Sequence, residues 1–130
     1  MSTIIVVPHT HWDREWYLPF ERYRYFMVHM VDGLLLLLDD EEDYSHFLFD
    51  GQVSLLEDYV EIRPDKKEDL IQAISKGRIG TGPWYTMPDE FLVSGEALIR
   101  NLLLGHQIVS GITTFHIYNI AFQAQIIHIL

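Results

Sequence analysis

Runs of hydrophobic residues alternate with polar stretches along the chain, in a pattern that predicts strands separated by helices. Residues 4–7 form a short apolar run rich in β-branched side chains, typical of a strand covered on both faces, and Pro8 ends it. From Pro19 onward, apolar residues recur at the spacing of one helix face, which Gly33 could interrupt. The positions on this face are Phe20, Tyr23, Met27, Met30, Val31, Leu34, Leu35 and Leu38. This part of the sequence predicts a buried strand followed by a long amphipathic helix.

Acidic residues fill positions 39–43 and separate this helix from a second predicted strand. We expect the acidic run to be a solvated loop, because neighbouring carboxylates repel one another. Residues 47–49 are apolar again and predict the strand, which Asp50 and Gly51 close as turn residues.

Capping signals predict two further helices. Ser54 stands three residues before a glutamate, a capping-box spacing that predicts a helix from Ser54 to a point before Pro64. Asp65 repeats this spacing, and Gly77 stands where the C-terminal cap of the next helix is expected.

The last third of the chain predicts a strand, a helix and another strand. The strand runs from Arg78 into residues 84–86, and Ser94 opens a helix that reaches about Ser110. Residues 113–118 alternate as in a further strand. The predicted apolar face of the helix comprises Leu98, Ile99, Leu102 and Leu103.

This order of elements predicts an α/β fold with a parallel sheet and crossover helices. The 130 residues are enough for one compact domain with its own core, and no repeat or linker divides them. We therefore expect residues 1–130 to form a single α/β domain.

Charge and composition narrow the classes of partner. Nine basic and nineteen acidic residues give a net charge of −10 with neutral histidines, which disfavours binding to nucleic acid. A neutral or cationic small ligand, or a bound cation, fits better. The chain has no cysteine, so a metal would be held by imidazole and carboxylate rather than by thiolate.

The sequence shows no signal for export or membrane insertion. No basic region precedes the apolar residues at the N-terminus, so we expect no signal peptide. The leucines at 34–38 are far too short a run to cross a bilayer. These observations predict a soluble, cytoplasmic protein.

The stretch PHTHWDREW at 8–16 carries the strongest candidate for metal binding. His9, His11 and Asp13 follow the first predicted strand, and ligands gather at the carboxyl ends of parallel strands. Side chains two residues apart lie on the same side of an extended chain. The chelating pair is either His9 with His11 or His11 with Asp13, and the alternative is that these are hydrogen-bonded structural residues.

Aromatic and acidic residues at the ends of the predicted strands are candidates for carbohydrate binding. An aromatic platform can support a sugar ring, while carboxylates accept hydrogen bonds from its hydroxyl groups. The alternative is that the aromatic residues belong to the core and that the acids cap turns. The aromatic candidates are Trp16, Trp84 and Tyr85, and the acidic candidates are Asp50, Asp89 and Glu90.

Three motifs resemble those of the glycoside hydrolase family 38 α-mannosidases. They are HTHWDREW at 9–16, FDGQ at 49–52 and RIGTGPWYTMPDEFLVSGEALIRNLLLG at 78–105. The resemblance, which includes the spacing between the motifs, covers about the first 105 to 110 residues. It implies an incomplete version of a seven-stranded, barrel-like α/β domain, the N-terminal part of a catalytic domain.

The resemblance also implies a function for the first motif. His11 and Asp13 would bind a catalytic zinc ion, and Trp16 would pack against the sugar in the −1 subsite. The family acts on α-mannosides by a retaining mechanism, in which a carboxylate attacks the anomeric carbon and a covalent intermediate is hydrolysed. The expected substrate is a mannose-containing oligosaccharide.

The sequence departs from the family in its last twenty residues. A nucleophile motif, Pro-Asp-x-Phe-Gly, is expected near 118–124, where this chain reads YNIAFQA. Residues 88–91, PDEF, belong to the preceding block and are not the nucleophile. A further histidine ligand is also missing, so no catalytic residue is identified. We interpret the segment from about residue 111 as foreign or rearranged sequence, and expect a truncated, inactive fragment in which zinc binding is weak or absent.

Two other functions are alternatives to the α-mannosidase. A non-catalytic remnant would associate with copies of itself through an exposed sheet edge and apolar helix faces. A metal-dependent carbohydrate deacetylase shares a related scaffold, but it usually needs two histidines one helical turn apart, and no H-x-x-x-H occurs here.

Overall fold

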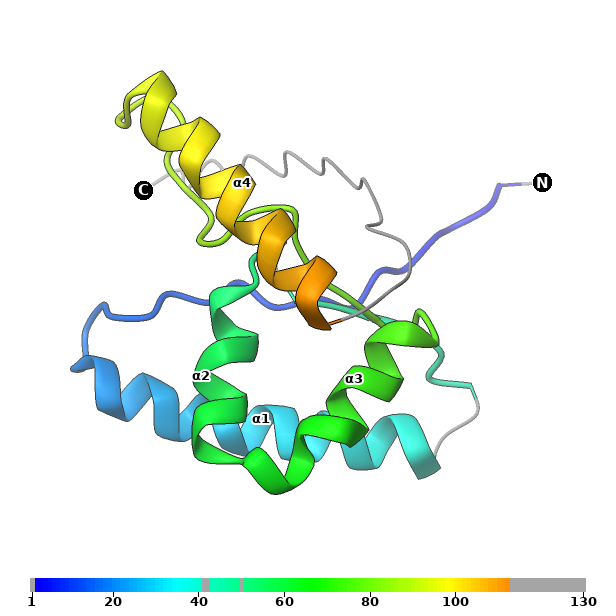
Figure 1. Cartoon of the computed structure of the whole chain (residues 1–130). Helices are drawn as coiled ribbons and strands as arrows, with labels where there is room; N and C mark the ends of the chain where they lie inside the picture. Colours follow the sequence, from blue (N-terminus) through cyan, green and yellow to red (C-terminus); the bar gives the residue numbers. More distant parts are fainter. Residues whose placement is uncertain (1, 41–42, 50, 113–130) are drawn as a thin grey trace.

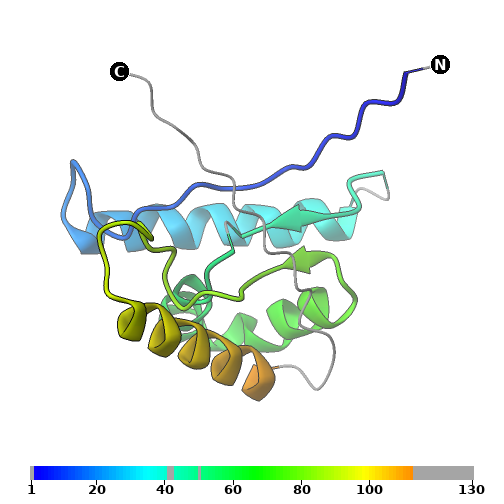
Figure 2. The ribbon, with the colours of Figure 1, turned by 90° about the horizontal axis from the view of Figure 1, so that it is seen from above.

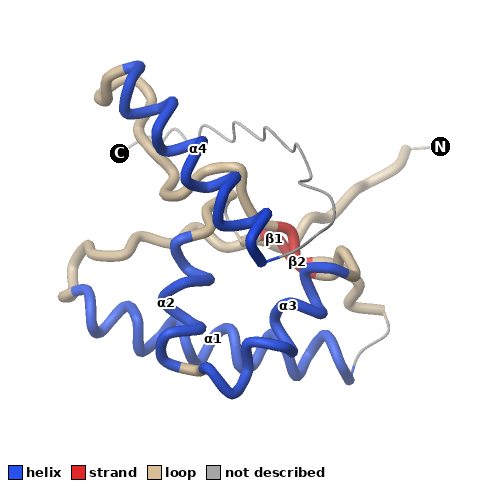
Figure 3. Tube along the Cα trace, in the orientation of Figure 1, coloured by secondary structure: helices blue, strands red, loops and turns tan. Residues whose placement is uncertain are grey.

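The computed structural model describes residues 2–40, 43–49 and 51–112, which contain four α-helices and two short strands. Helix α1 (Phe20–Asp40) packs against α2 (Ser54–Ile62) and α3 (Lys67–Ser75), which stand side by side on it (Figure 1). Helix α4 (Gly95–Ile112) lies on the far side of α2 and α3 from α1 (Figure 2), and strands β1 (Phe47–Leu48) and β2 (Ile79–Gly80) lie near its C-terminal end (Figure 3). Among the described residues, no helix is long and apolar enough to cross a membrane.

Helix α1 confirms the amphipathic pattern predicted for the start of the chain. The helix begins directly after Pro19 and continues through Gly33 without a break. It buries four positions of the predicted face, namely Met27, Val31, Leu34 and Leu38. Asp39 and Asp40 belong to the helix, so the expectation of a loop over the whole acidic run was wrong at its first two residues. The leucines before them hold this last turn against the core, and both carboxylates stay exposed.

The two strands form a parallel pair, as the predicted α/β order requires (Figure 3). Phe47 is opposite Ile79, and Leu48 is opposite Gly80. On the other side of β1, the amide of Leu48 donates to the carbonyl oxygen of Pro8 (3.0 Å), and the amide of Thr10 donates to that of Leu48 (3.1 Å). Strand β1 is therefore central, with residues 8–10 on one side and β2 on the other.

The strand expected at residues 4–7 is not formed. These residues run alongside no described strand, and Ile4 and Ile5 are 87% and 83% exposed. An apolar strand is stable only when a neighbour pairs with its backbone and its faces are covered. Among the described residues, pairing begins only at Pro8, where the chain meets β1.

The strand expected from Arg78 to residues 84–86 is shortened to β2. The chain turns after Thr81, because Gly82 has a positive φ of +72° and a cis peptide bond precedes Pro83. Trp84 then makes a separate parallel bridge with Gln52. The strand expected at 113–118 lies outside the described residues.

Helix α2 begins at Ser54, but the predicted capping box is wrong. Val53 is the N-cap, and the hydroxyl oxygen of Ser54 is buried without a hydrogen-bond partner in the structure. The amides of Val53 and Ser54 instead donate to the carbonyl oxygens of Trp84 (2.9 Å) and Tyr85 (2.9 Å). A neighbouring segment therefore satisfies the first amides of the helix, which leaves the side-chain cap no role.

The second predicted cap, at Asp65, is also wrong, whereas the one at Gly77 is confirmed. Lys66 is the N-cap of α3, and Asp65 pairs with Arg63, which holds the pKa of that carboxyl below its usual value. Gly77 has a φ of +70° and its amide donates to Ile74. The next amide donates to Ala73, completing a Schellman motif.

Helix α4 starts as predicted, but its packing face coincides with only half of the predicted one, at the half-buried Leu98 and Leu102. The hydroxyl of Ser94 accepts a hydrogen bond from the amide of Ala97 (3.2 Å), so Ser94 caps the helix. Of the predicted apolar face, Ile99 and Leu103 are exposed. A stripe with one-turn spacing, Asn101, Gly105 and Val109, meets residues 82–86 instead.

Gly105 is the point of closest approach in this packing. A Cβ atom at this position would lie 2.2 Å from the carbonyl oxygen of Pro83 and 2.7 Å from the amide nitrogen of Tyr85. No side chain can occupy that space without moving the backbone. Gly33 in α1 is the opposite case, since nothing lies within 4 Å of a Cβ atom there.

The core lies where α1 and α2 meet the strand ends. Its largest fully buried side chains are Tyr59 and Phe49. The hydroxyl of Tyr59 donates to Asp32 (2.6 Å), and Arg63 forms an ion pair with the same carboxylate. Burial, together with the hydrogen bond to Asp32, raises the pKa of Tyr59 well above its usual value.

Replacing the two helical glycines should shift stability in opposite directions. We expect Gly105→Ala to lower the free energy of unfolding by about 1–3 kcal/mol, because α4 must move away from residues 82–86. Gly33→Ala should raise it by about 1 kcal/mol, since alanine favours a helix and meets no neighbour. Urea denaturation followed by circular dichroism measures both, and equal effects at the two positions would contradict the packing described here.

Candidate functional site

The HTHWDREW motif continues beyond the end of its pairing with β1 and bends from Arg14 onward, and its side chains alternate between half-buried and exposed up to residue 15. Trp12 and Arg14 are half-buried, whereas His11 and Asp13 are exposed. This alternation puts the latter two side chains on the same side of the chain. The Nε2 atom of His11 lies 3.8 Å from the Oδ2 atom of Asp13, and each side chain is a little under half exposed.

The pair His11 and Asp13 has a geometry that suits a small cation. Zinc ligands lie about 2.0–2.2 Å from the ion, which in a tetrahedral shell separates two ligand atoms by about 3.3–3.6 Å. The observed separation of 3.8 Å needs only a small side-chain rotation to reach this range. The alternative pair of His9 with His11 stays open, because the bond between Nδ1 of His9 and the carbonyl oxygen of Thr10 (2.9 Å) leaves Nε2 of His9 as a potential ligand.

The described residues supply only part of a metal shell. Within residues 2–40, 43–49 and 51–112, no group of three or more histidine, cysteine, aspartate or glutamate side chains could surround one ion. A catalytic zinc normally has three protein ligands and an open position. His11 and Asp13 therefore fit the group as two ligands of an incomplete shell.

Two residues that the sequence analysis did not single out hold the motif in place. The side-chain amide of Gln52, itself buried, donates to the carbonyl oxygen of Trp12 (2.8 Å). The guanidinium of Arg14 binds the carboxylate of Asp58 through two hydrogen bonds, of 3.0 and 2.9 Å. The FDGQ motif contains Gln52, but nothing in the spacing indicated that its side chain reaches back to residue 12.

Gln52 also joins the motif to the loop that contains Trp84 and Tyr85. Its backbone pairs with Trp84 in a parallel bridge, whose hydrogen bonds run from Trp84 to Gly51 (3.1 Å) and from Val53 to Trp84 (2.9 Å). Three chain segments thus meet at one residue, namely the motif, the end of β1 and the loop after β2. We call these three converging segments the rim.

Tyr85 is held inside this rim rather than displayed on it. Its amide and that of Thr86 both donate to the side-chain oxygen of Asn101, at 2.7 and 3.1 Å. Its ring packs against the core, and burial, together with a hydrogen bond to Glu57, raises the pKa of the phenol. The structure therefore gives Tyr85 a packing role beside its predicted place in an aromatic platform.

The remaining predicted sugar contacts are dispersed. Trp16 is 66% exposed and packs edge-on against Tyr17, with ring centroids 5.6 Å apart. Asp89 is exposed and its side chain accepts a hydrogen bond from the amide of Phe91 (3.2 Å), as a turn-capping aspartate does. Asp50 lies outside the described residues.

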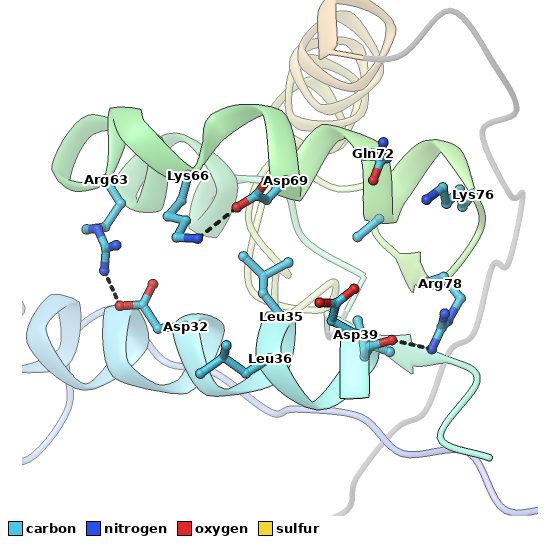
Figure 4. A pocket seen from close by; sticks show the side chains of 12 residues that line it. Asp32, Leu35, Leu36, Asp39, Arg63, Lys66, Asp69, Gln72, Lys76 and Arg78 are labelled. Carbon is cyan, nitrogen blue, oxygen red and sulfur yellow. Dashed lines mark hydrogen bonds and ion pairs between the residues drawn. The ribbon is translucent and has the colours of Figure 1, made fainter. Parts of the chain in front are cut away.

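A groove of about 360 Å³ between α1 and α3 contains none of the predicted site residues (Figure 4). Charged side chains line it, and several are already paired with one another or with backbone. Lys66 binds Asp69 (2.8 Å), and Arg78 donates to the carbonyl oxygen of Leu38 (2.7 Å). The candidate site is therefore the open face formed by the motif, not this groove.

Residues 1–122 match the family model described as the glycosyl hydrolases family 38 N-terminal domain. The chain belongs to glycoside hydrolase family 38. Members of this family are glycosidases and are generally metal-dependent. The match reaches residue 122, past the break expected near residue 111, whereas the two sequence matches below span 104 and 107 residues.

Individual relatives agree with this assignment. The chain is 47% identical over 104 residues to a putative mannosylglycerate hydrolase of Halalkalibacterium halodurans, and 30% identical over 107 residues to human alpha-mannosidase 2. An α-mannosidase from Enterococcus faecalis V583 superposes with a TM-score of 0.78 at 40% identity over 82% of this chain. A second family 38 structure from Enterococcus faecalis gives 0.74 at 37% identity. This family 38 chain spans 12% of the length of the first of these relatives and 9% of the second.

The paired geometry of His11 and Asp13 predicts weak zinc binding that depends on both side chains. His11→Ala combined with Asp13→Ala should abolish heat exchange with Zn²⁺ in a calorimetric titration, because the motif then keeps no chelating pair. His9→Ala is the matched control and should leave the affinity within about twofold, since the proposed pair does not include His9. Equal zinc affinities in the wild type and the double variant would show that the pair is wrongly assigned.

Proposed function

We propose that this chain is the N-terminal part of the catalytic domain of a zinc-dependent, retaining glycosidase that acts on α-mannosides. The family match over residues 1–122 carries the proposal, and the outward-facing pair in the HTHWDREW motif supports it. In this proposal residues 1–130 form one α/β unit of a larger, seven-stranded barrel-like domain. The chain contributes part of the site and does not complete it.

His11 and Asp13 would hold the zinc ion in this proposal. When bound, zinc supplies Lewis-acid stabilisation and a template for the sugar hydroxyl groups. Trp16 is free to stack on the sugar, because most of its side chain is exposed. Asp50, Asp89 and the rim around Trp84 would accept or cover the remaining hydroxyl groups.

The nucleophile is not assigned to any residue of this chain. A retaining glycosidase needs one carboxylate to attack the anomeric carbon and a second group to protonate the leaving oxygen. Asp58 is buried and bound by Arg14, so it is unavailable for either role. We therefore propose that these 130 residues are inactive alone.

The substrate proposed is a mannose-containing molecule. The relative at 47% identity is named for mannosylglycerate and the relative at 30% for α-mannosidase activity. Both names refer to the cleavage of a mannosyl compound. The proposed substrate is therefore either a mannose-containing oligosaccharide or a small mannoside.

A chimeric enzyme tests this function directly. We expect residues 1–105 to replace the matching segment of the Enterococcus faecalis α-mannosidase and to preserve turnover of an aryl α-mannoside, because the two segments superpose. In that chimera, His11→Ala or Asp13→Ala should lower turnover at least ~100-fold, and His9→Ala should leave it nearly unchanged. The absorbance of the released phenol measures turnover in the chimera and in each of its three variants.

Two outcomes would contradict the proposal. A folded chimera that keeps full turnover after both substitutions would show that His11 and Asp13 are not part of the site. Robust turnover by the 130-residue chain alone would show that it contains a nucleophile after all. The isolated chain should otherwise show no activity above that of its Asp13→Ala variant.

A second candidate function is self-association without catalysis. Apolar side chains at residues 4–7 are exposed next to residues 8–10, whose outer side pairs with no described strand, an arrangement that promotes pairing between chains. In such an assembly, two copies would cover each other's edges. No specific ligand is needed for this function.

Sedimentation velocity discriminates this candidate. The wild-type chain should sediment as a dimer or larger species, and Ile5→Lys should shift it towards the monomer, because a charge there opposes strand pairing. Ser75→Lys, at an exposed polar position on α3, is the control and should not change the assembly. A wild-type chain that remains monomeric at high concentration excludes self-association.

A further inference from the structure

We propose that Arg14 is a positioning residue for the His11 and Asp13 pair, acting through the buried carboxylate of Asp58. The inference rests on the proposed function, because it assigns Arg14 a role in the metal half-site. Arg14 contacts neither a sugar nor a metal in this proposal. It fixes the stretch of backbone from which the two ligand side chains project.

The contact between Arg14 and Asp58 is bidentate and largely shielded from water. Nε of Arg14 lies 3.0 Å from one carboxylate oxygen and Nη2 lies 2.9 Å from the other. Asp58 is only 6% exposed. Two parallel hydrogen bonds between a guanidinium and a carboxylate fix the orientation of the arginine side chain as well as its distance. The ammonium group of a lysine fixes only the distance.

Helix α1 braces the same guanidinium from a second direction. The ring of Phe20 lies close to both Arg14 and Arg24, with the two guanidinium carbons 4.8 and 5.2 Å from its centroid. Arg24 also lies 3.7 Å from Asp58. The residue after Asp13 is thereby attached to both α1 and α2.

The residue before Asp13 is fixed as well. The side-chain amide of Gln52 donates a hydrogen bond to the carbonyl oxygen of Trp12. The ring of Trp12 packs edge-on against that of Tyr23, with centroids 6.1 Å apart. Asp13 is therefore held between two anchored neighbours. Because the chain is extended here, this double attachment also determines where His11 points.

This arrangement matters for binding more than for stability. A two-ligand site gains affinity when its ligands are already in place, because little conformational freedom is lost on binding. A buried ion pair, by contrast, adds little net stability, since desolvation offsets most of the attraction. The anchoring of Arg14 is therefore expected to show mainly in metal affinity.

The chain offers a matched control in a second ion pair between α2 and α1. Arg63 pairs with Asp32 near the C-terminal end of α2, and Asp32 also accepts the hydroxyl of Tyr59. Among the described residues, the hydrogen bonds and ion pairs of the Arg63 side chain go to Asp32 and Asp65, outside the motif. The exposed fraction of its side chain (29%) is close to that of Arg14 (35%). Substituting Arg63 therefore disturbs a similar ion pair without disturbing residues 11–13.

The experiment compares Arg14→Lys with Arg63→Lys in the full chain. Zn²⁺ affinity comes from the NMR titration of the His11 ring, backbone order at residues 11–13 from ¹⁵N relaxation, and stability from urea denaturation. We expect Arg14→Lys to weaken Zn²⁺ binding about tenfold and to increase backbone motion at 11–13. Arg63→Lys should change neither, even where the two variants lose similar stability.

Each outcome of this experiment tests whether Arg14 positions residues 11–13. Unchanged order at residues 11–13 in Arg14→Lys, or unchanged Zn²⁺ affinity, overturns the proposal. An equal loss of affinity in Arg63→Lys also overturns it, because the effect would then be general destabilisation. If the wild type binds no Zn²⁺ but Arg14→Lys alone loosens residues 11–13, positioning stands and the metal half of the proposed function fails.

Discussion

The parallel hydrogen bonding on both sides of β1 organises this structure. Leu48 bonds to Pro8 and Thr10 on one side, and β1 pairs with β2 on the other. Parallel neighbours end at the same edge of a sheet, so the residues that follow each of them are brought together. Three segments remote in sequence meet there, and Gln52 contacts the other two through its side chain and its backbone.

Local signals predicted the parts of the fold that local interactions determine. The periodic face of α1, the serine cap of α4 and the glycine after α3 were all evident from the sequence, because each depends on neighbours within one helical turn. The cap expected at Ser54 failed since the first amides of α2 are satisfied by Trp84 and Tyr85 instead. A tertiary contact of that kind leaves no trace in residue spacing.

The same distinction applies to the site. The spacing of His11 and Asp13 was enough to predict that they share one side of the chain, which is a property of any extended backbone. Their supports could not be predicted in this way. Arg14 binds Asp58, which is forty-four residues away in the sequence, and Gln52 binds Trp12, which is forty residues away. Both contacts depend on how the helices pack. The packing roles of Asn101 and Gly105 could not be predicted either, because the pattern of apolar residues indicates neither an amide that binds backbone nor a position that must lack a side chain.

The one-turn spacing of Asn101, Gly105 and Val109 makes α4 sensitive to its rotational register. Each inserted or deleted residue turns the following part of a helix by about 100°. A single deletion between Ser94 and Asn101 would therefore present leucine, histidine or serine side chains to residues 82–86, where the backbone leaves room only for a hydrogen at position 105. The length of the first half of α4 is thus constrained as tightly as its composition. The position of the loop that carries Trp84 and Tyr85 therefore depends on the number of residues in the first half of α4, because that number decides which side chains face the loop.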